Sequence, residues 1–392
     1  MEMYGKLDEN RFQIRKLNFR LILYVLALSV FGIIMVHSAT ADEVSSSILN
    51  TTEKQILGVV IGIFAMVVLV IFDYRFLVKY SWVFYLLAIL LLSYVLFFAP
   101  AIYGAHRWIY VPGFGTIQPS EFSKPAMVLL LSLIASRMKE KISKVYLLLL
   151  YFIAAAPVVF LVLREPDLST TIVLMIIIVT ILFVAGISYR WVLAALVFLV
   201  LFGVLFMIAV YQEDQIWLNK ILEPHQVERI NGFFFPDQYP GAVYQQNSSV
   251  MAIGGGGLFG KGLNNNSLDS VKNGDFLVEE QCDFIFAVVG EELGFVGSVA
   301  LIVLIMLMVL ECFLTALRTS DLAGRMIATA TGTALGMQSI INIGVSLLLI
   351  PNTGIPLPFI SAGMSSLLSS FILIGLTLSV SLWGPRGKKI YR

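Results

Sequence analysis

Charged residues are scarce in this chain: Asp, Glu, Lys and Arg make up 13% of its 392 residues. Soluble globular domains carry about 25% charged residues, so the composition excludes an ordinary soluble domain. Hydrophobic residues account for 58%, and the mean hydropathy is +0.89. The net charge of +1 offers no basic surface for nucleic acid. These values predict an integral membrane protein.

Cysteine and histidine are also rare. The two cysteines, Cys282 and Cys312, cannot build a disulfide framework. His37, His106 and His225 lack the spacing of a metal site. A Walker motif is absent as well, so we expect no direct use of ATP. The sequence therefore predicts no disulfide scaffold, no histidine metal centre and no P-loop ATPase.

Long apolar runs are what the chain does contain. About 20 apolar residues cross the hydrocarbon core of a bilayer as a helix. We predict ten such segments, at residues 21–39, 56–72, 82–102, 119–136, 144–163, 169–188, 191–211, 284–316, 324–350 and 364–383. The fourth reaches full length only if its helix starts near Pro119, because proline is favourable in a first turn. The predicted fold class is an all-α polytopic membrane protein with ten transmembrane helices.

Lysine and arginine set the orientation. Most of the 26 lie beside one set of segment ends. The opposite side has only Lys54, Arg107, Lys124, Arg164, Lys220, Arg229, Lys261 and Lys272. Both termini are therefore predicted to be cytoplasmic, as a segment 1–20 and a tail 384–392. A large loop, 212–283, lies outside between the seventh and eighth helices, and residues 1–392 form one membrane domain.

Carboxylates gather where this outer loop meets the eighth segment. Asp283 stands at the junction, Glu279 precedes it, and Glu291 and Glu292 lie about two turns deeper. An Asp at this point is explained as well by helix capping as by catalysis. Bare carboxylates in lipid are costly, so the deeper pair must face a polar cavity or cations. Such a cluster suits general-base chemistry or a metal held by oxygen ligands.

A second set of charges lies at the outer connections before the fourth segment and after the fifth. Glu121 and Lys124 are three residues apart and share one helix face. They form either a first-turn ion pair or a functional intramembrane pair. Arg107 and Lys124 together suit a pyrophosphate, because Arg binds phosphate bidentately and Lys binds it as a point charge. For Asp167 we rank two interpretations: the preferred one is an N-cap of the sixth span, and the other is a catalytic carboxylate.

Two outer segments are rich in special backbone residues. The glycine run 254–257 is either a flexible turn or a place where backbone amides approach an anion. Segment 351–363 carries three prolines in eight residues, which forbid a regular helix and predict a rigid cavity rim. It offers no titratable side chain for chemistry.

These motifs, taken in order, resemble those of the SEDS family (shape, elongation, division and sporulation). The resemblance covers nearly the whole chain. It rests on Gly104-Ala105-His106-Arg107-Trp108-Ile109, Gln118-Pro119-Ser120-Glu121-Phe122-Ser123-Lys124, Pro166-Asp167-Leu168, and the segments 254–262, 283–294 and 352–359.

The resemblance implies ten transmembrane helices and a peptidoglycan glycosyltransferase acting on lipid II in the bacterial cytoplasmic membrane. Asp283 matches the family's essential outer aspartate, and Glu121 with Lys124 matches its functional pair. It also implies a class B penicillin-binding protein, a transpeptidase, as partner.

On this basis Asp283 is the expected general base for transfer from an undecaprenyl-pyrophosphate-linked glycan to lipid II. The expected substrate- and pyrophosphate-binding residues are Arg107, Glu121, Lys124, Arg229 and Gln245. Supporting roles are expected for Asp167, Glu279, Glu291 and Glu292. No metal ligand is assigned, and the sequence leaves open whether a divalent cation such as magnesium or manganese assists.

Some positions depart from the family pattern. The usual Pro-Glu is Val278-Glu279, the usual His-Thr is Gln281-Cys282, and the usual Gln before Pro-Asp is Glu165. Ser169 replaces a usual Gly, and Ser361-Ala362-Gly363-Met364-Ser365-Ser366 replaces a usual Ser-Tyr-Gly-Gly-Ser-Ser. The short cytoplasmic tail favours the elongation member RodA over the division and sporulation members FtsW and SpoVE.

Two other functions fit a membrane protein with these charges. A lipid II flippase or other polyprenyl-lipid transporter would use the same cavity and cations without a base. A scaffold would only anchor the transpeptidase, and it would leave Glu121, Lys124 and Asp283 without a purpose. A transporter needs polar residues accessible from both faces, whereas the polar cluster here lies on the outer face only, which favours the enzyme.

Overall fold

A computed structural model describes residues 16–41, 49–100, 106–111, 115–138, 145–212, 215–264 and 281–385. Within these ranges the chain forms fourteen helices and one two-stranded sheet. The helices of the first half are α1 (Phe19–Ala39), α2 (Thr51–Ile71), α3 (Tyr74–Lys79), α4 (Ser81–Phe98), α5 (Pro119–Arg137), α6 (Val145–Arg164) and α7 (Leu168–Val184). Those of the second half are α8 (Tyr189–Tyr211), α9 (Ile216–Ile221), α10 (Pro224–Phe234), α11 (Pro240–Gly255), α12 (Ile285–Arg318), α13 (Leu322–Ser346) and α14 (Met364–Trp383).

Every predicted apolar segment contains one long helix, and α5 begins at Pro119 as predicted. Five helices of the described chain are long and apolar enough to cross a membrane: α1, α2, α4, α12 and α14. Shorter apolar stretches lie in α6, α7 and α8. The protein is therefore an all-α polytopic membrane protein with several apolar helices.

Side-chain caps fix where several of these helices begin. Asn18 accepts a hydrogen bond from the Leu21 amide at the start of α1. Asn50 and Glu53 form a reciprocal capping box at the start of α2, which satisfies two amides that the helix leaves without partners. With this cap, α2 begins five residues before the predicted apolar run. The prediction missed these residues because it followed hydropathy, and the first turn of the helix is polar.

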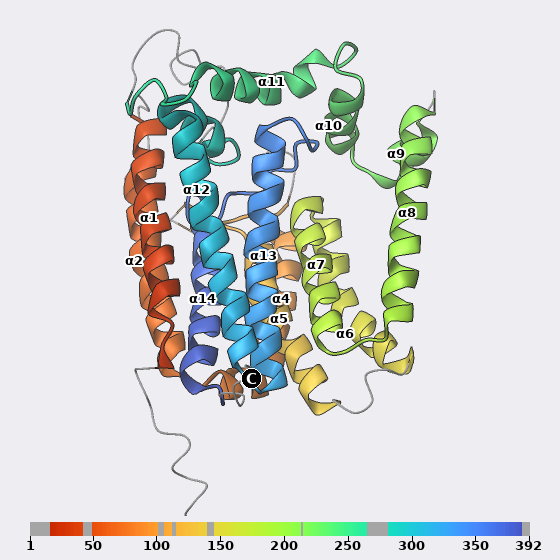
Figure 1. The fold of residues 1–392 in the computed structure, drawn as a ribbon. Coiled ribbons are helices and arrows are strands. Elements are labelled where there is room, and N and C mark those ends of the chain that lie inside the picture. The colour runs from red at the N-terminus through yellow and green to blue at the C-terminus, as the bar shows by residue number, and fades with distance from the viewer. Residues whose placement is uncertain are drawn as a thin grey trace, which may run out of the picture.

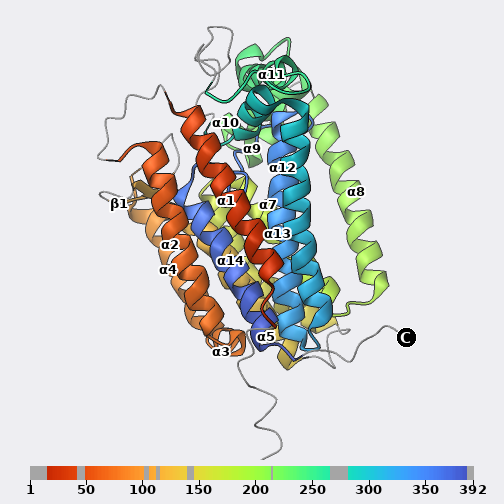
Figure 2. The same ribbon diagram turned by 60° about the vertical axis from the view of Figure 1, so that its left-hand side comes forward.

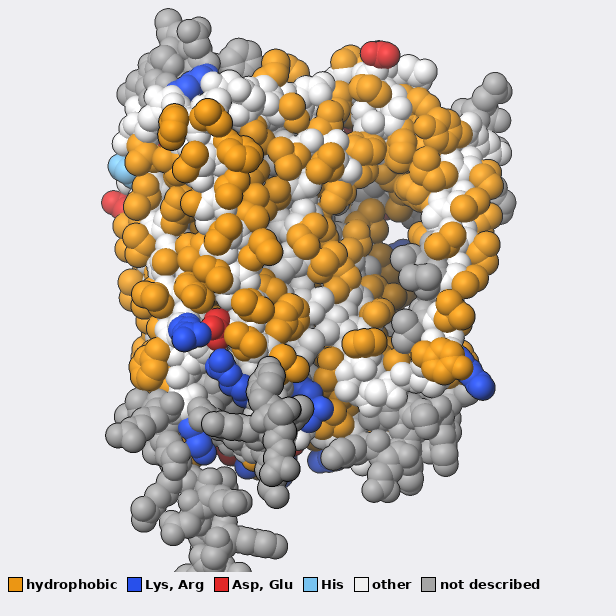
Figure 3. Space-filling model, viewed as in Figure 1, with side chains coloured by type: hydrophobic (Ala, Val, Ile, Leu, Met, Phe, Trp, Pro, Cys, Tyr) orange, Lys and Arg blue, Asp and Glu red, His pale blue; other side chains and the backbone are white. Residues whose placement is uncertain are grey.

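The helices form a bundle around α13 and α14 (Figures 1 and 2). α14 packs on α2, α5 and α13, while α13 packs on α5, α7 and α12, and α1 packs on α12. Most of α14 is buried, whereas α2 and α4 expose many large apolar side chains. Hydrophobic side chains cover the face seen in Figure 3, and blue Lys and Arg side chains gather at its lower end. That distribution is typical of a bundle surrounded by lipid.

The predicted outer loop 212–283 is partly helical. It contains α9, α10 and α11, and α11 lies across one end of the bundle (Figure 1). Val210, Leu218 and Val227 form a small separate core that joins the end of α8 to α9 and α10. Figure 3 shows the surface hollowed between α7 and α8, with Lys or Arg atoms visible inside the hollow.

The connection before α5 carries a short hairpin. β1 (Ile109–Val111) pairs antiparallel with β2 (Gly115–Ile117), with Ile109 opposite Ile117. This hairpin, not expected from the sequence, places Arg107 just before β1 and leads directly into the first turn of α5.

Helix α12 is broken at Gly294, which has φ 67° and ψ −162°. This backbone region is essentially restricted to glycine. The predicted eighth segment is therefore two units: a short buried helix 285–293 and a long helix 295–318. The short unit begins two residues after Asp283.

Candidate active site

Asp283 lies two residues before α12, and Phe284 occupies the N-cap position without any side-chain cap bond. Asp283 is therefore not the N-cap residue of α12. Its backbone carbonyl accepts a hydrogen bond from Asn342 Nδ2 at 2.8 Å, and the same amide donates to the Ile355 carbonyl at 2.7 Å. Asn342, on α13, thus ties the Asp283 turn to the proline-rich segment 351–363. Sequence reasoning missed this residue, since a lone Asn in an apolar helix carries no motif.

The Asp283 carboxylate lies beside Gly354 of the proline-rich segment. A Cβ placed on Gly354 would be 3.3 Å from Asp283 Oδ2 and 3.8 Å from Arg229 Nη1. The carboxylate and the guanidinium therefore both border a residue without a side chain. Gly354 has φ +69°, a conformation that glycine adopts without strain. The predicted rim segment thus lies beside both Asp283 and Arg229.

Arg107 adds a second guanidinium to this group. Its Cζ lies 4.1 Å from the ring centroid of Trp108. Burial lowers the pKa of Arg107, and the positive charge of Arg229 lowers it further. The carboxyls of Asp167, Asp283 and Glu165 oppose this shift, Asp167 most strongly. The charges of four residues thus act on Arg107, and together with it they are hereafter called the outer charge cluster: Arg107, Glu165, Asp167, Arg229 and Asp283.

Asp167 caps α7, as its first interpretation predicted. It accepts from the Thr170 amide at 3.0 Å and from the Thr170 hydroxyl at 2.8 Å. It also accepts from Gln118 Nε2 at 2.7 Å and from the Ser120 hydroxyl at 3.0 Å. Asp167 therefore fixes the first turn of α5 against α7, so its carboxylate is fully engaged in structure.

Glu165 is a carboxyl that was not among the predicted site residues. The side chain is completely buried, and neither of its oxygens has a hydrogen-bond partner within the described residues. Burial, reinforced by Asp167 and opposed by Arg107, raises the pKa of Glu165 to about 9. Glu165 is therefore a neutral acid at pH 7. The sequence signal was its position beside Pro166, between two apolar runs.

Glu121 and Lys124 form a buried ion pair. Their Oε2 and Nζ atoms are 2.7 Å apart, and the two side chains are 5% and 1% exposed. Ser369 of α14 donates to the Glu121 carbonyl at 2.8 Å. In this arrangement the Lys124 ammonium binds its own helix. Ser120 of the same helix and Gln118, its N-cap residue, donate hydrogen bonds to Asp167, so the first turn of α5 is tied to the outer charge cluster.

Glu291 and Glu292 hold the glycine-rich segment rather than joining Asp283. Lys261 Nζ contacts Glu291 Oε1 at 2.7 Å, and Ser38 donates to the Glu292 carboxylate. The Lys261 and Gly262 amides donate to the carbonyls of these two residues at 2.9 and 3.0 Å. The amides of this turn are thus used inside the protein, not presented to an anion.

Close packing explains the glycines of this turn. A Cβ on Gly256 would lie 2.0 Å from the Gly290 carbonyl oxygen, and one on Gly260 would lie 2.1 Å from that of Glu292. Gln245 lies half-buried on α11, and its neighbour Gln246 donates to the Val345 and Ile350 carbonyls instead. The role of Gln245 stays a prediction. Glu279 lies outside the described residues.

The outer charge cluster has the parts that a glycosyl transfer with a diphosphate leaving group requires. A carboxylate can accept a proton, and two guanidiniums beside it can stabilise phosphate oxygens. Within the described ranges, no three His, Cys, Asp or Glu side chains are grouped to hold a metal ion.

Comparison with known proteins decides the family. Residues 19–383 match the family of cell cycle proteins that comprises FtsW, RodA and SpoVE. The chain is 34% identical to stage V sporulation protein E of Bacillus subtilis, over 92% of this chain and 96% of the relative. The chain belongs to the SEDS family.

Other SEDS relatives agree. The chain is 29% identical to a protein of Trichlorobacter lovleyi named "Probable peptidoglycan glycosyltransferase FtsW", over 94% of both chains. A chain solved in a peptidoglycan synthase complex that coordinates polymerization and crosslinking superposes with a TM-score of 0.75 at 28% identity, covering 93% of this chain and 97% of that one. The rod shape determining protein RodA of Thermus thermophilus superposes with a TM-score of 0.65 at 26% identity, covering 93% and 96%.

The predicted family and enzyme class are therefore confirmed: this is a SEDS peptidoglycan glycosyltransferase and a multi-pass membrane protein. The comparisons name both sporulation and division relatives and a rod-shape structure. They do not assign a role to any single residue, so the site rests on the geometry above.

Proposed function

We propose that this SEDS enzyme polymerises lipid II into glycan strands on the outer face of the bacterial cytoplasmic membrane. The donor is a glycan on undecaprenyl pyrophosphate, and the acceptor is lipid II. One observation carries the proposal: the Asp283 carboxylate and the Arg229 guanidinium both border Gly354, and the charge of Arg107 interacts with both of them.

Asp283 accepts the proton of the acceptor sugar's 4-hydroxyl group. The hydroxyl oxygen forms a bond to the donor's anomeric carbon while the bond from that carbon to the pyrophosphate oxygen breaks. The electron pair leaves with the diphosphate, whose growing negative charge Arg107 and Arg229 stabilise. Asp283 then releases its proton to water, and the next cycle begins with the longer strand as donor.

A lipid-linked substrate needs a route for its tails. The hollow between α7 and α8 in Figure 3 opens to the side of the bundle and contains Lys or Arg atoms, which supports a groove where tails lie in the bilayer and phosphates lie beside cations. The matching proposal for topology is ten membrane crossings with both termini in the cytoplasm. The cation distribution of the sequence supports this orientation.

The proposed partner is a class B penicillin-binding protein, which would cross-link the strands that this enzyme makes. The relative solved in a peptidoglycan synthase complex supports a partner of this kind. The proposed cellular role is elongation; division and sporulation, after which other relatives are named, are the alternatives. Restoring rod shape, septation or sporulation in strains lacking each activity separates the three.

Polymerisation of lipid II by the purified full chain, with and without the transpeptidase, tests the mechanism. Asp283→Asn keeps the shape of the side chain and removes the base, so we expect the rate to fall by about 10² to 10⁴-fold. Asp237→Asn is the matched control, because Asp237 is an exposed carboxylate of the same outer region. Full polymerisation by Asp283→Asn would refute the assignment. Translocated monomer without glycan chains would indicate a transporter, and no product at all from wild type with its partner would indicate a scaffold.

A further inference from the structure

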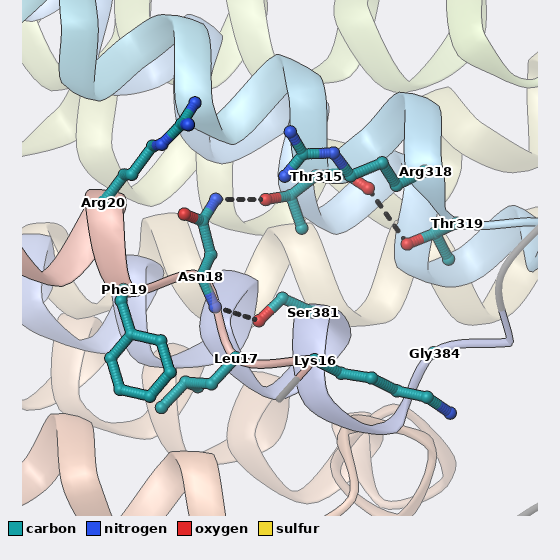
Figure 4. A pocket seen from close by; sticks show the side chains of 10 residues that line it. All are labelled: Lys16, Leu17, Asn18, Phe19, Arg20, Thr315, Arg318, Thr319, Ser381 and Gly384. Atoms are coloured by element: carbon teal, nitrogen blue, oxygen red, sulfur yellow. Dashed lines mark hydrogen bonds between the residues drawn. The ribbon is translucent and has the colours of Figure 1, made fainter. Parts of the chain in front are cut away.

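The end of the bundle opposite Asp283 contains a polar pocket with an excess of positive charge. It has a volume of about 320 Å³ and lies where α1 begins and where α12 and α14 end. Figure 4 shows its lining side chains coming from these three elements, with Lys16, Arg20 and Arg318 among them. No step of the glycosyl transfer uses these three cations.

One buried carboxylate partly balances them. Glu311 of α12 is 4% exposed and accepts from Asn18 Nδ2 at 2.9 Å. Arg20 and Arg318 approach it only at 3.7 and 3.9 Å, and their side chains are 74% and 54% exposed. Among the described residues, Glu311 is the carboxylate that both arginines approach, so two cations share one negative charge at this end of the pocket. Each guanidinium has five N–H donors, and these long ion pairs use few of them, so most can bind a further anion.

An apolar groove continues from this pocket along the same face of α1. It is lined by Leu23, Leu26, Ala27, Val30, Phe31 and Ile34, and nearly all of its surface is apolar. Phe19 and Arg20 of the polar pocket precede Leu23 by four and three residues, so helical spacing puts both pockets on one stripe. Phe19, Leu23 and Val30 are each about 60% exposed.

We propose that this paired site binds an anionic phospholipid of the cytoplasmic leaflet. Arg20 and Arg318 hold the headgroup phosphate, and an acyl chain lies in the α1 groove. Lys16, which extends in another direction in Figure 4, adds only to the positive charge of the site. Basic pockets at the cytoplasmic ends of membrane helices bind anionic headgroups in this way. The apolar continuation favours a lipid over a free phosphate ion, because a free ion has no use for it. The site does not depend on the proposed catalytic mechanism.

Lipid binding to the purified full chain tests this proposal. The protein is placed in phosphatidylcholine nanodiscs with a rising fraction of phosphatidylglycerol, and retained lipid is counted by native mass spectrometry. We expect selective retention of phosphatidylglycerol by wild type. Each cation near a membrane surface contributes roughly a five-fold gain in affinity, so the double variant Arg20→Gln, Arg318→Gln should bind about 25-fold more weakly. Arg325→Gln is the control, since Arg325 is an exposed cation at the start of α13 outside the pocket.

Two further arms identify the source of the phosphate. Ala27→Phe fills the groove without changing charge and should weaken phosphatidylglycerol binding, while inorganic phosphate should not displace the lipid. Thermal unfolding verifies that each variant is folded. Equal retention of both lipids, or equal loss in the Arg325 control, would overturn the site. Displacement by inorganic phosphate with no effect of Ala27→Phe would overturn the lipid as occupant, as would a dimer cross-linked through the α1 groove.

Discussion

Replacing Gly354 by alanine tests whether the contact over this residue positions the base. At φ +69° an L-residue costs about 1–2 kcal/mol. The new methyl would also lie 3.3 Å from Asp283 Oδ2 and 3.8 Å from Arg229 Nη1, so the carboxylate must move by a few tenths of an ångström. Because misplacement by about 1 Å costs roughly 10²-fold in rate, we expect Gly354→Ala to polymerise lipid II about ten-fold more slowly.

Gly257→Ala is the matched control for the backbone. Gly257 has φ +57°, and a Cβ there meets nothing within 4 Å, so it carries the same backbone cost without touching the site. Both variants should unfold at a similarly lowered temperature, and only Gly354→Ala should lose polymerisation rate, measured with equal amounts of purified, folded protein. If the two variants lose activity equally, backbone strain explains the effect and the contact with Asp283 does not position the base.

Two further substitutions separate charge from structure. The pKa of Glu165 is about 9 in the folded protein, above its ordinary value of 4.5. Between these pH values the folded chain keeps a proton that the unfolded chain loses. The free energy of unfolding is therefore unaffected below about pH 4.5 and falls by about 1.4 kcal/mol per pH unit up to pH 9. The unfolding temperature of Glu165→Gln should therefore fall less between pH 6 and 8 than that of wild type. Equal falls in the two proteins would contradict a buried neutral Glu165. Lys124→Met should destabilise by about 3–5 kcal/mol because it strands the Glu121 carboxylate. The double variant with Glu121→Gln should regain stability; recovery of full polymerisation as well would rule out Lys124 as a cation for the leaving group.

The positions of the long helices were predictable because lipid-facing and core-facing residues are both apolar. Each predicted segment contains a helix, and the last, 364–383, coincides with α14. Errors arose where polar residues begin or interrupt a helix. The Asn50 capping box extends α2, and the glycine-specific backbone at Gly294 divides the eighth segment. The helices of the outer loop were missed because their sequences, rich in Gly, Asn and Gln, show no long apolar run.

The individual site residues were easier to predict than their grouping. Asp283, Arg107 and Arg229 are charges on the outer side of apolar segments, and that is visible in the sequence. That Asp283 and Arg229 both border Gly354 depends on packing between segments far apart in the chain. Glu291 and Glu292 were predicted to support the site, and the structure shows each bound near the glycine-rich turn. Periodicity places such residues at a depth in the membrane but does not say which neighbour they face.

The break in α12 bears on how tolerance to substitution is interpreted. A side chain at 294 would collide with the backbone of Gly260 and Leu258 at 2.3 and 2.7 Å, besides facing a forbidden dihedral pair. Every replacement there should disrupt the join between the glycine-rich turn and the short helix that follows Asp283. A saturation mutagenesis scan would find this position as sensitive as a catalytic residue, although it has no side chain to act on the substrate. Intolerance in this stretch therefore reports backbone packing and not the place of the reaction.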